Sequence, residues 1–195
     1  MSETFCSLPW NHLATHPHGV CTLCCESEQH QGMSQAFNGD EGLTRKLVTL
    51  QNVDDFAEIT NSDSFSKVRL AMLQGQKPKE CRKCWDLESA GMKSKRSYEN
   101  RRVPMDIDHA MSITNKDGTL KEVNYEFVEL RLGNHCNVQC RTCNPYSSSR
   151  WLKDWDTIYP ERPSLPEMLT QKNFNWLKII SEGDEGRITR RLSCY

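Results

Sequence analysis

The sequence lacks the segments that would place a protein in or across a membrane. No stretch of the chain approaches the ~20 consecutive apolar residues that a bilayer-spanning helix needs. The first ten residues, Met1 to Trp10, contain neither the basic region nor the apolar region of a secretory signal. We therefore expect a cytoplasmic protein with no membrane partner.

The sequence also has little excess charge and few apolar residues. The formal net charge is −1, which argues against a nucleic-acid-binding surface built on bulk basic charge and against an acidic tail. Hydrophobic residues make up 36% of the 195 residues, whereas globular domains reach about 45–50% when glycine is counted. Burial alone therefore predicts a modest core, and we expect a further stabilising element.

Cysteine is abundant by contrast, with ten residues. In a chain without a secretory signal, thiols are expected to stay reduced, and reduced thiolates at close spacing are typical metal ligands. The ten fall into an N-terminal group, a pair, a run of three and one terminal residue: Cys6, Cys21, Cys24 and Cys25; Cys81 and Cys84; Cys136, Cys140 and Cys143; and Cys194.

Apolar residues at helical spacing predict three helices. They cover residues 43–60, 63–73 and 84–100, and the last is expected to bury Trp85 and Met92. The basic residues of the third helix and its end are interpreted as a solvated face; they are Lys93, Lys95, Arg96, Arg101 and Arg102.

Two segments lack helical periodicity. Residues 1–42 are rich in polar residues, and we expect irregular structure there that a metal could organise. Residues 103–120 are expected to form a linker, with a turn at Asn115 to Gly118.

The C-terminal half begins with a strong strand signal. Residues 123–132 are rich in β-branched and aromatic residues and end before Gly133. The run of three cysteines follows as a loop, and Ser147 to Ser149 are expected to open a helix through Trp155. The predicted order is therefore strand, cysteine loop, helix.

Cys136, Cys140 and Cys143 have the spacing Cys-x3-Cys-x2-Cys. Three thiolates on one loop can hold three corners of a cubane iron–sulfur cluster and leave one iron open, whereas zinc would need a fourth ligand. Asn134 to Pro145, placed directly after a strand, resembles the radical SAM signature. The resemblance implies a 4Fe–4S cluster on the three cysteines and S-adenosyl-L-methionine on the open iron, cleaved reductively to the 5′-deoxyadenosyl radical.

Two neighbours of the run have further interpretations. Thr142 stands at the position before the third cysteine, whose backbone contacts the adenine in that family. The family usually has an aromatic residue there, so the chain departs from its pattern. His135 is interpreted as a loop residue, with a fourth zinc ligand as the alternative.

The N-terminal cysteines have a second pattern. Cys6-x12-Gly19-x4-Cys24, followed by Cys81-x2-Cys84, resembles the SPASM and twitch domains that hold auxiliary 4Fe–4S clusters in radical SAM proteins. The resemblance implies one auxiliary cluster on Cys6, Cys24, Cys81 and Cys84. Four cysteines suit zinc equally well by spacing.

Other N-terminal residues are alternatives to this set. Cys21 and Cys25 compete with Cys24 for the second ligand position. His12, His16 and His18 are spaced like ligands, but we expect them to lie in mobile loops.

Together these features predict an α/β protein, α+β overall. Residues 1–115 would form an irregular, cysteine-rich helical twitch-like module, and residues 116–195 the first strand–loop–helix unit of an incomplete radical SAM barrel. Only 52 residues follow Cys143, and no Gly-Gly-Glu motif occurs among them. We therefore expect a shortened chain, or one completed by a partner, with little catalysis of its own.

Three functions remain open at this point. The first is an iron–sulfur protein of the radical SAM type, which would need a low-potential electron donor and an unidentified peptide or small-molecule substrate. The second is a structural zinc-binding interaction module without catalysis. The third is a remnant whose cysteines bind no metal.

Overall fold

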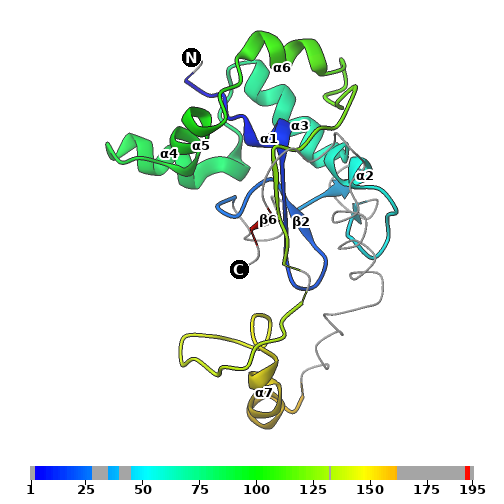
Figure 1. Cartoon of the computed structure of the whole chain (residues 1–195), viewed down its shortest axis with the longest axis vertical. Helices are drawn as coiled ribbons and strands as arrows, with labels where there is room; N and C mark the ends of the chain where they lie inside the picture. Colours follow the sequence, from blue (N-terminus) through cyan, green and yellow to red (C-terminus); the bar gives the residue numbers. More distant parts are fainter. Residues whose placement is uncertain (1–2, 28–34, 40–44, 132, 162–191, 194–195) are drawn as a thin grey trace.

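The computed structural model describes residues 3–27, 35–39, 45–131, 133–161 and 192–193. Helices and strands mix along the chain, so the fold is α+β as the sequence predicts (Figure 1). The described strands form a four-stranded sheet and a two-stranded sheet, with no closed barrel among them.

The larger sheet has the strand order β2-β1-β5-β6. Strand β1 (His12–Thr15) pairs antiparallel with β2 (Cys21–Thr22) and parallel with β5 (Phe127–Glu129). Strand β5 also pairs in parallel with β6 (Leu192–Ser193). All four residues of β1 are buried, so the prediction of irregular structure through residues 1–42 is wrong at the centre of the sheet.

A short helix leads into this sheet. Helix α1 (Leu8–Asn11) has Pro9 in its first turn, where a missing backbone N–H costs nothing, and all four of its residues are buried. Between β1 and β2 the chain turns at Gly19, whose φ of +80° favours glycine.

The predicted helix over 43–60 is mostly wrong. The structure has strand β3 (Phe37–Asn38) paired with β4 (Lys46–Leu47), then a turn, and helix α2 only over Phe56–Thr60. Two of the buried apolar residues between β4 and α2, Val48 and Leu50, are instead held by backbone hydrogen bonds to distant parts of the chain. The Val48 amide donates to the Ala36 carbonyl at 2.8 Å, and the Leu50 amide to the Gly19 carbonyl at 2.9 Å.

Helix α3 (Asp63–Leu73) has the predicted bounds, and Ser62 lies at its N-cap position. It buries Phe65, Val68 and Met72, and the chain leaves it through Gly75 with a φ of +75°.

The predicted single helix over 84–100 is instead two helices. A 3-10 turn (Lys79–Cys81) leads into α4 (Arg82–Ser89), and α5 spans Lys95–Arg102. Gly91 has a φ of +75°, which ends α4. Met92 therefore lies in the connection and is exposed, against the prediction, whereas Trp85 is buried as predicted.

The predicted linker contains helix α6 (Ile107–Ile113), which Asp106 caps by accepting from the His109 amide. The expected turn does follow it, since the Gly118 amide donates to the Asn115 carbonyl at 2.9 Å. The sequence shows no apolar periodicity over α6, because Ala110 is the one residue that this helix buries.

The predicted order of strand, cysteine loop and helix is confirmed. Strand β5 is three residues long, shorter than the predicted 123–132, and the loop after it ends in a 3-10 turn (Ser149–Trp151) and helix α7 (Leu152–Ile158). Residues 162–191, 194 and 195, Cys194 among them, lie outside the described residues.

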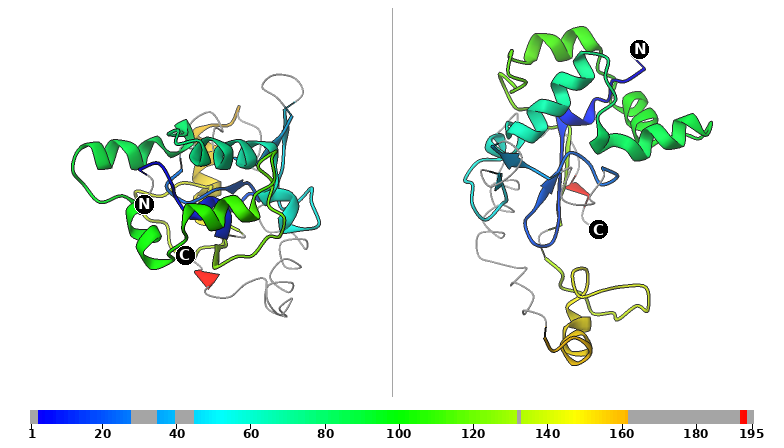
Figure 2. Two further views of the ribbon diagram at one scale, coloured as in Figure 1. Left: turned by 90° about the horizontal axis from the view of Figure 1, so that it is seen from above. Right: turned by 180° about the vertical axis from the view of Figure 1, so that it is seen from behind.

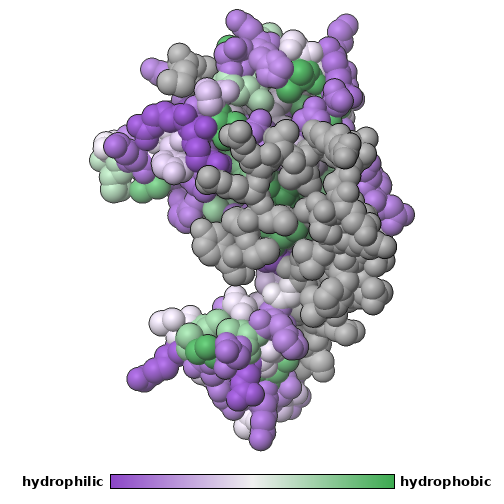
Figure 3. All heavy atoms as spheres, viewed as in Figure 1, coloured by the Kyte–Doolittle hydropathy of each residue, from purple (hydrophilic) through white to green (hydrophobic). Residues whose placement is uncertain are grey.

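The elements are arranged around the β1–β5 pair. Helices α3 and α6 lie at one end of the long axis, with α4 and α5 on one side of the strands and α2 on the other (Figures 1 and 2). The loop and α7 form a lobe at the opposite end (Figure 3). The sheet joins residues on both sides of position 115, and the division of the chain there stays a prediction.

Candidate metal centre

Four cysteines from three separate segments line one cavity. They are Cys6, Cys24, Cys81 and Cys84, the set implied by the resemblance. Cys6 directly precedes the turn into α1, Cys24 follows β2, and the other two lie on the 3-10 turn and on α4. The structure therefore brings together residues separated by up to 78 positions in the sequence.

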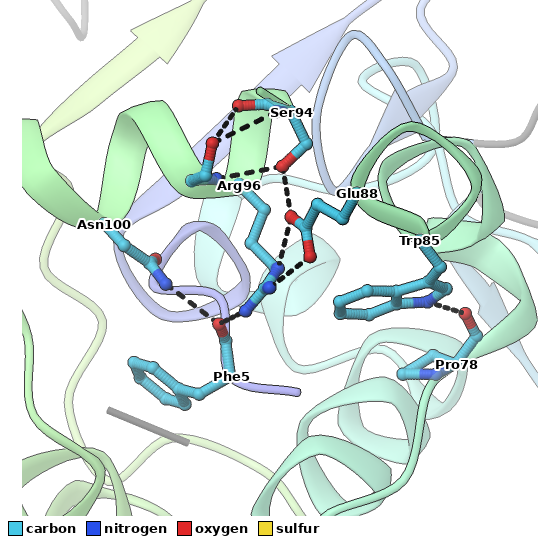
Figure 4. Close-up of polar contacts among 8 residues, drawn as sticks. Phe5, Pro78, Trp85, Glu88, Ser94, Arg96 and Asn100 are labelled. Carbon is cyan, nitrogen blue, oxygen red and sulfur yellow. Dashed lines mark hydrogen bonds and ion pairs between the residues drawn. The ribbon is translucent and has the colours of Figure 1, made fainter. Parts of the chain in front are cut away.

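Local contacts fix the segment that carries the Cys81–Cys84 pair. The Trp85 indole Nε1 donates to the Pro78 carbonyl at 3.0 Å, which closes the chain before α4 onto the helix (Figure 4). Because Cys81 and Cys84 are three residues apart where a 3-10 turn runs into α4, their side chains lie on one face.

Burial raises the pKa of three of these four thiols. It raises the pKa of Cys6 to about 12, with a smaller contribution from neighbouring Cys84. It also raises the pKa of Cys24 and Cys81, and Cys6 and Cys84 add to both shifts. Because the four cysteines line one cavity, a negative charge on one thiolate disfavours a charge on the next.

The cavity is small, at about 20 Å³. Among the described residues, no three His, Cys, Asp or Glu side chains are grouped around one point as ligands of a single metal ion. The four cysteines thus share a cavity wall rather than one point. The four cysteines fit an iron–sulfur cluster by their chemistry, because four thiolates are the usual protein ligands of such a cluster.

Neither competing cysteine lines this cavity in the described part of the chain. Cys21 is fully buried, and its Sγ lies 3.6 Å from the Gly19 carbonyl. Cys25 is half-buried, and its pKa is raised by burial and by the nearby Glu129 carboxylate. All nine described cysteines are free thiols.

The histidines do not join the cavity either. His12 is buried in β1, so the prediction of a mobile loop is wrong for it. His16 and His18 lie at the β1–β2 turn with ring centroids 6.0 Å apart. Burial lowers the pKa of His12 and His16 to about 4 and also lowers that of His18.

Two cations also line the cavity, although their sequence pattern predicted a solvated face for both. Lys95 and Arg96, at the start of α5, line the cavity with the four cysteines. The Arg96 side chain is only 13% exposed, so the interpretation of this basic run as a solvated face is wrong there. Their position depends on the break between α4 and α5, which returns α5 to the cavity.

The second cysteine run, Cys136, Cys140 and Cys143, is more exposed to solvent than the four-cysteine cavity. Cys136 lines a cavity of about 960 Å³ together with His135 and residues of α7, whereas Cys140 is exposed and Cys143 is half-buried. Thr142 is exposed. Within the described residues the structure does not gather these three cysteines around one point.

Backbone contacts nevertheless hold the loop in shape. The Cys143 amide donates to the Cys140 carbonyl at 2.9 Å, and the Trp151 indole Nε1 donates to the same carbonyl at 3.1 Å. At the base of the loop, Asn134 Nδ2 donates to the Pro145 carbonyl at 2.7 Å. These contacts tie the loop to the start of α7.

A comparison with family models bears on the first site. Residues 6–85 match the SPASM iron–sulfur cluster-binding domain. The match begins at the first cavity cysteine and ends one residue after the last, so this SPASM segment contains the whole candidate set. It includes neither α5, with the two cations, nor the second cysteine run.

The other comparisons add no relatives. No curated protein and no solved structure matches the chain. None of the described helices is both long and apolar enough to cross a bilayer.

Proposed function

We propose that this chain is an iron–sulfur protein with two cluster sites. Cys6, Cys24, Cys81 and Cys84 would hold an auxiliary 4Fe–4S cluster. Cys136, Cys140 and Cys143 would hold a second 4Fe–4S cluster, with S-adenosyl-L-methionine at its open iron. The observation that carries the proposal is the shared cavity of four cysteines inside the SPASM segment.

The chemistry of the donor set supports the first site. Metal binding must remove the thiol protons of its cysteine ligands, and the free energy of cluster binding then stabilises the fold. Three separate segments meet at the cavity, so a bound cluster would cross-link the N-terminal strands to α4. This would supply the stabilising element that the low apolar content calls for.

The second site rests on the strand–loop–helix order and on the cavity beside Cys136. Three cysteines leave one iron without a protein ligand, and a cluster bound there would supply the electron for cleavage of S-adenosyl-L-methionine. The chain's own part is to hold the loop, through Asn134 and Trp151, and to present the cysteines. The electron donor and substrate would be a low-potential protein and a peptide or small molecule.

Metal analysis tests the proposal. The full chain is purified without oxygen, reconstituted with iron and sulfide, and assayed for iron, acid-labile sulfide and zinc. Two clusters predict about eight irons and eight sulfides per chain, with absorbance near ~400 nm. Colourless protein with zinc and no sulfide would instead identify the zinc-binding module, and protein without metal would identify the remnant.

Variants assign the first site. Cys84→Ala is expected to lose about half of the iron, because one of the two clusters loses a ligand. Cys21→Ala is the matched control, since this buried cysteine belongs to the same segment but does not line the cavity. Equal iron loss in both variants would contradict the assignment.

A further inference from the structure

Arg96 contacts two segments of the chain, the backbone at Phe5 and helix α4 at Glu88 (Figure 4). Its Nη1 donates to the Phe5 carbonyl at 2.8 Å, and its Nε donates to Glu88 Oε1 at 3.0 Å. Its Nη2 donates to the other oxygen of the same carboxylate. The guanidinium also lies over the Trp85 ring, 4.8 Å from the ring centroid.

These partners are neighbours of two of the four cysteines. Phe5 directly precedes Cys6. Trp85 directly follows Cys84, and Glu88 lies one turn further along α4. Arg96 therefore connects the segment that carries Cys6 to the helix that carries Cys84, while its own side chain lines the cavity between them.

A second residue of α5 strengthens the connection at Cys6. Asn100 Nδ2 donates to the Phe5 carbonyl at 2.9 Å, and its Oδ1 accepts from the Ser7 amide at 2.9 Å. The backbone on both sides of Cys6 is thus held from one helix, with Arg96 and Asn100 one turn apart.

Arginine suits this position because of its shape and charge. Its planar fork can bind a carboxylate with two hydrogen bonds and still donate to a carbonyl, which a lysine ammonium at one point cannot reproduce. The side chains of Arg96 and Glu88 are 13% and 24% exposed, so solvent screens the pair only in part. Burial opposes ionisation of Glu88, but hydrogen bonds from Arg96 and Ser94 lower the pKa of its carboxyl.

We propose that Arg96 is a positioning residue of the four-cysteine site, which fixes Cys6 relative to Cys84 and places a positive charge on the cavity wall. The positioning role stands on the contacts of the chain itself. The role of the charge rests on the proposed function, because it concerns a bound cluster. Neither residue of the Arg96–Glu88 pair belongs to the SPASM segment.

Two variants separate position from charge. Arg96→Lys keeps the charge and loses the fork, whereas Arg96→Gln loses both. Arg82→Gln is the matched control, because Arg82 also pairs with a carboxylate on α4, Asp86, but both side chains are well exposed. The control removes one arginine–carboxylate pair without touching the cavity.

The first measurement uses the full chain without metal. Alkylation of Cys6 and Cys84 by N-ethylmaleimide is followed by mass spectrometry of peptides, with buried Cys21 as the internal reference for global opening. Both Arg96 variants are expected to alkylate Cys6 and Cys84 about tenfold faster than the unmodified chain, since charge-assisted bonds to the Cys6 segment are lost. The rate at Cys21 and the rates in Arg82→Gln should stay within about twofold.

The second measurement is the reduction potential of the cluster in reconstituted protein, which reports the effect of the Arg96 charge. Arg96→Gln removes a positive charge from the cavity wall and leaves the Glu88 carboxylate without its arginine partner, and the loss of that positive charge disfavours the added electron. A tenfold shift of the one-electron equilibrium corresponds to about 59 mV, and we expect a more negative potential of this order. Arg96→Lys should stay close to the unmodified protein, because a loss of packing alone does not move the potential in this charge-dependent way.

The outcomes are distinguishable. Unchanged alkylation in both Arg96 variants, or an equal rise at Cys21, would overturn the positioning role. Equal potentials in Arg96→Gln and the unmodified protein would overturn the role of the charge. If the unmodified chain binds no cluster, the proposed function and the charge role fail together, and the alkylation rates alone decide the positioning role.

Discussion

His12 and Phe127 lie side by side in register on parallel strands, with their ring centroids 4.1 Å apart. His12 Nδ1 is 3.0 Å from the Phe127 backbone oxygen, and since a carbonyl only accepts, Nδ1 carries the proton. The Arg102 guanidinium covers the same phenyl ring, 4.4 Å from its centroid. This contact joins the N-terminal strand to the strand that leads into the second cysteine run.

The buried His12 predicts a loss of stability in mild acid. Burial lowers its pKa to about 4 from the ordinary 6.5, so the unfolded chain takes up a proton first. The stabilising contribution is therefore complete above pH 6.5 and is lost as the pH falls toward 4. Linkage gives a loss of about 2 kcal/mol between pH 7 and pH 5 from this residue.

Urea unfolding of the full chain at both pH values measures the effect. His12→Gln removes the titration, and its free energy of unfolding should fall less between pH 7 and pH 5 than that of the unmodified chain. The remaining decrease belongs to other groups, including His16 and His18. Identical pH slopes in the two chains would show that His12 is not the responsible group.

Arg69 is a buried charge held by oxygen atoms from four places. Its guanidinium donates to the carbonyls of Gly118, Pro9 and Thr60 at 2.6, 3.0 and 2.8 Å, and to Ser66 Oγ at 3.1 Å. Arg69→Met would leave three buried carbonyls without these donors, and we expect a loss of about 3 kcal/mol or more in the free energy of unfolding.

The matched control for Arg69 is Lys67→Met on the same helix, because Lys67 is exposed. Surface substitutions usually change stability by about 0.5 kcal/mol or less. Chemical denaturation of both variants gives the comparison, and a loss in Arg69→Met no larger than in the control would refute the anchoring role.

Two glycines both have a positive φ, but we expect their replacement by alanine to lower the free energy of unfolding by different amounts. Gly118 has a φ of +86°, and a Cβ there would lie 2.4 Å from the Ser66 carbonyl oxygen. Gly75 has a φ of +75°, but apart from its two chain neighbours no atom of the described residues lies within 4 Å of its Cβ position. Gly75→Ala should cost about 1–2 kcal/mol of conformational strain, whereas Gly118→Ala should cost clearly more, because the turn must move away from α3. Thermal unfolding ranks the two, and equal midpoints would contradict the clash.

The two cysteine sites should lose their metal independently. Cys140→Ala is expected to remove about half of the iron of the reconstituted chain and the spectral response to S-adenosyl-L-methionine, since that ligand would bind the open iron of the second site. Cys81→Ala should remove a similar amount of iron and keep the response. A response that persists in Cys140→Ala would exclude the second site as the place where S-adenosyl-L-methionine binds.

Formation of 5′-deoxyadenosine from S-adenosyl-L-methionine would measure the proposed activity of the second site directly. Reduction with dithionite in the presence of S-adenosyl-L-methionine, followed by chromatography, measures 5′-deoxyadenosine. Little product is expected from this chain alone, because no Gly-Gly-Glu motif is present to accept the amino group. Product formed over many turnovers would contradict that expectation.

Local signals in the sequence determined several elements. Helix α3, the turn at Asn115 to Gly118 and the order of strand, cysteine loop and helix follow from periodicity, turn residues and capping within a few positions. The resemblance of the cysteine pattern to SPASM and twitch domains likewise implied the four residues that line one cavity, although Cys21 and Cys25 remained alternatives to Cys24 until the structure was known.

Only the tertiary structure decided the features that depend on distant partners. Strand β1 gives a weak local signal and forms because it pairs with β5, 115 residues away. The backbone at Val48 and Leu50 is held by hydrogen bonds to the carbonyls of Ala36 and Gly19, so these two buried side chains do not lie on a helix. Arg96 is indistinguishable from a solvated basic residue until the bend at Gly91 returns α5 to the cavity. A side chain's partners across the fold are set by packing, and no spacing along the chain encodes them.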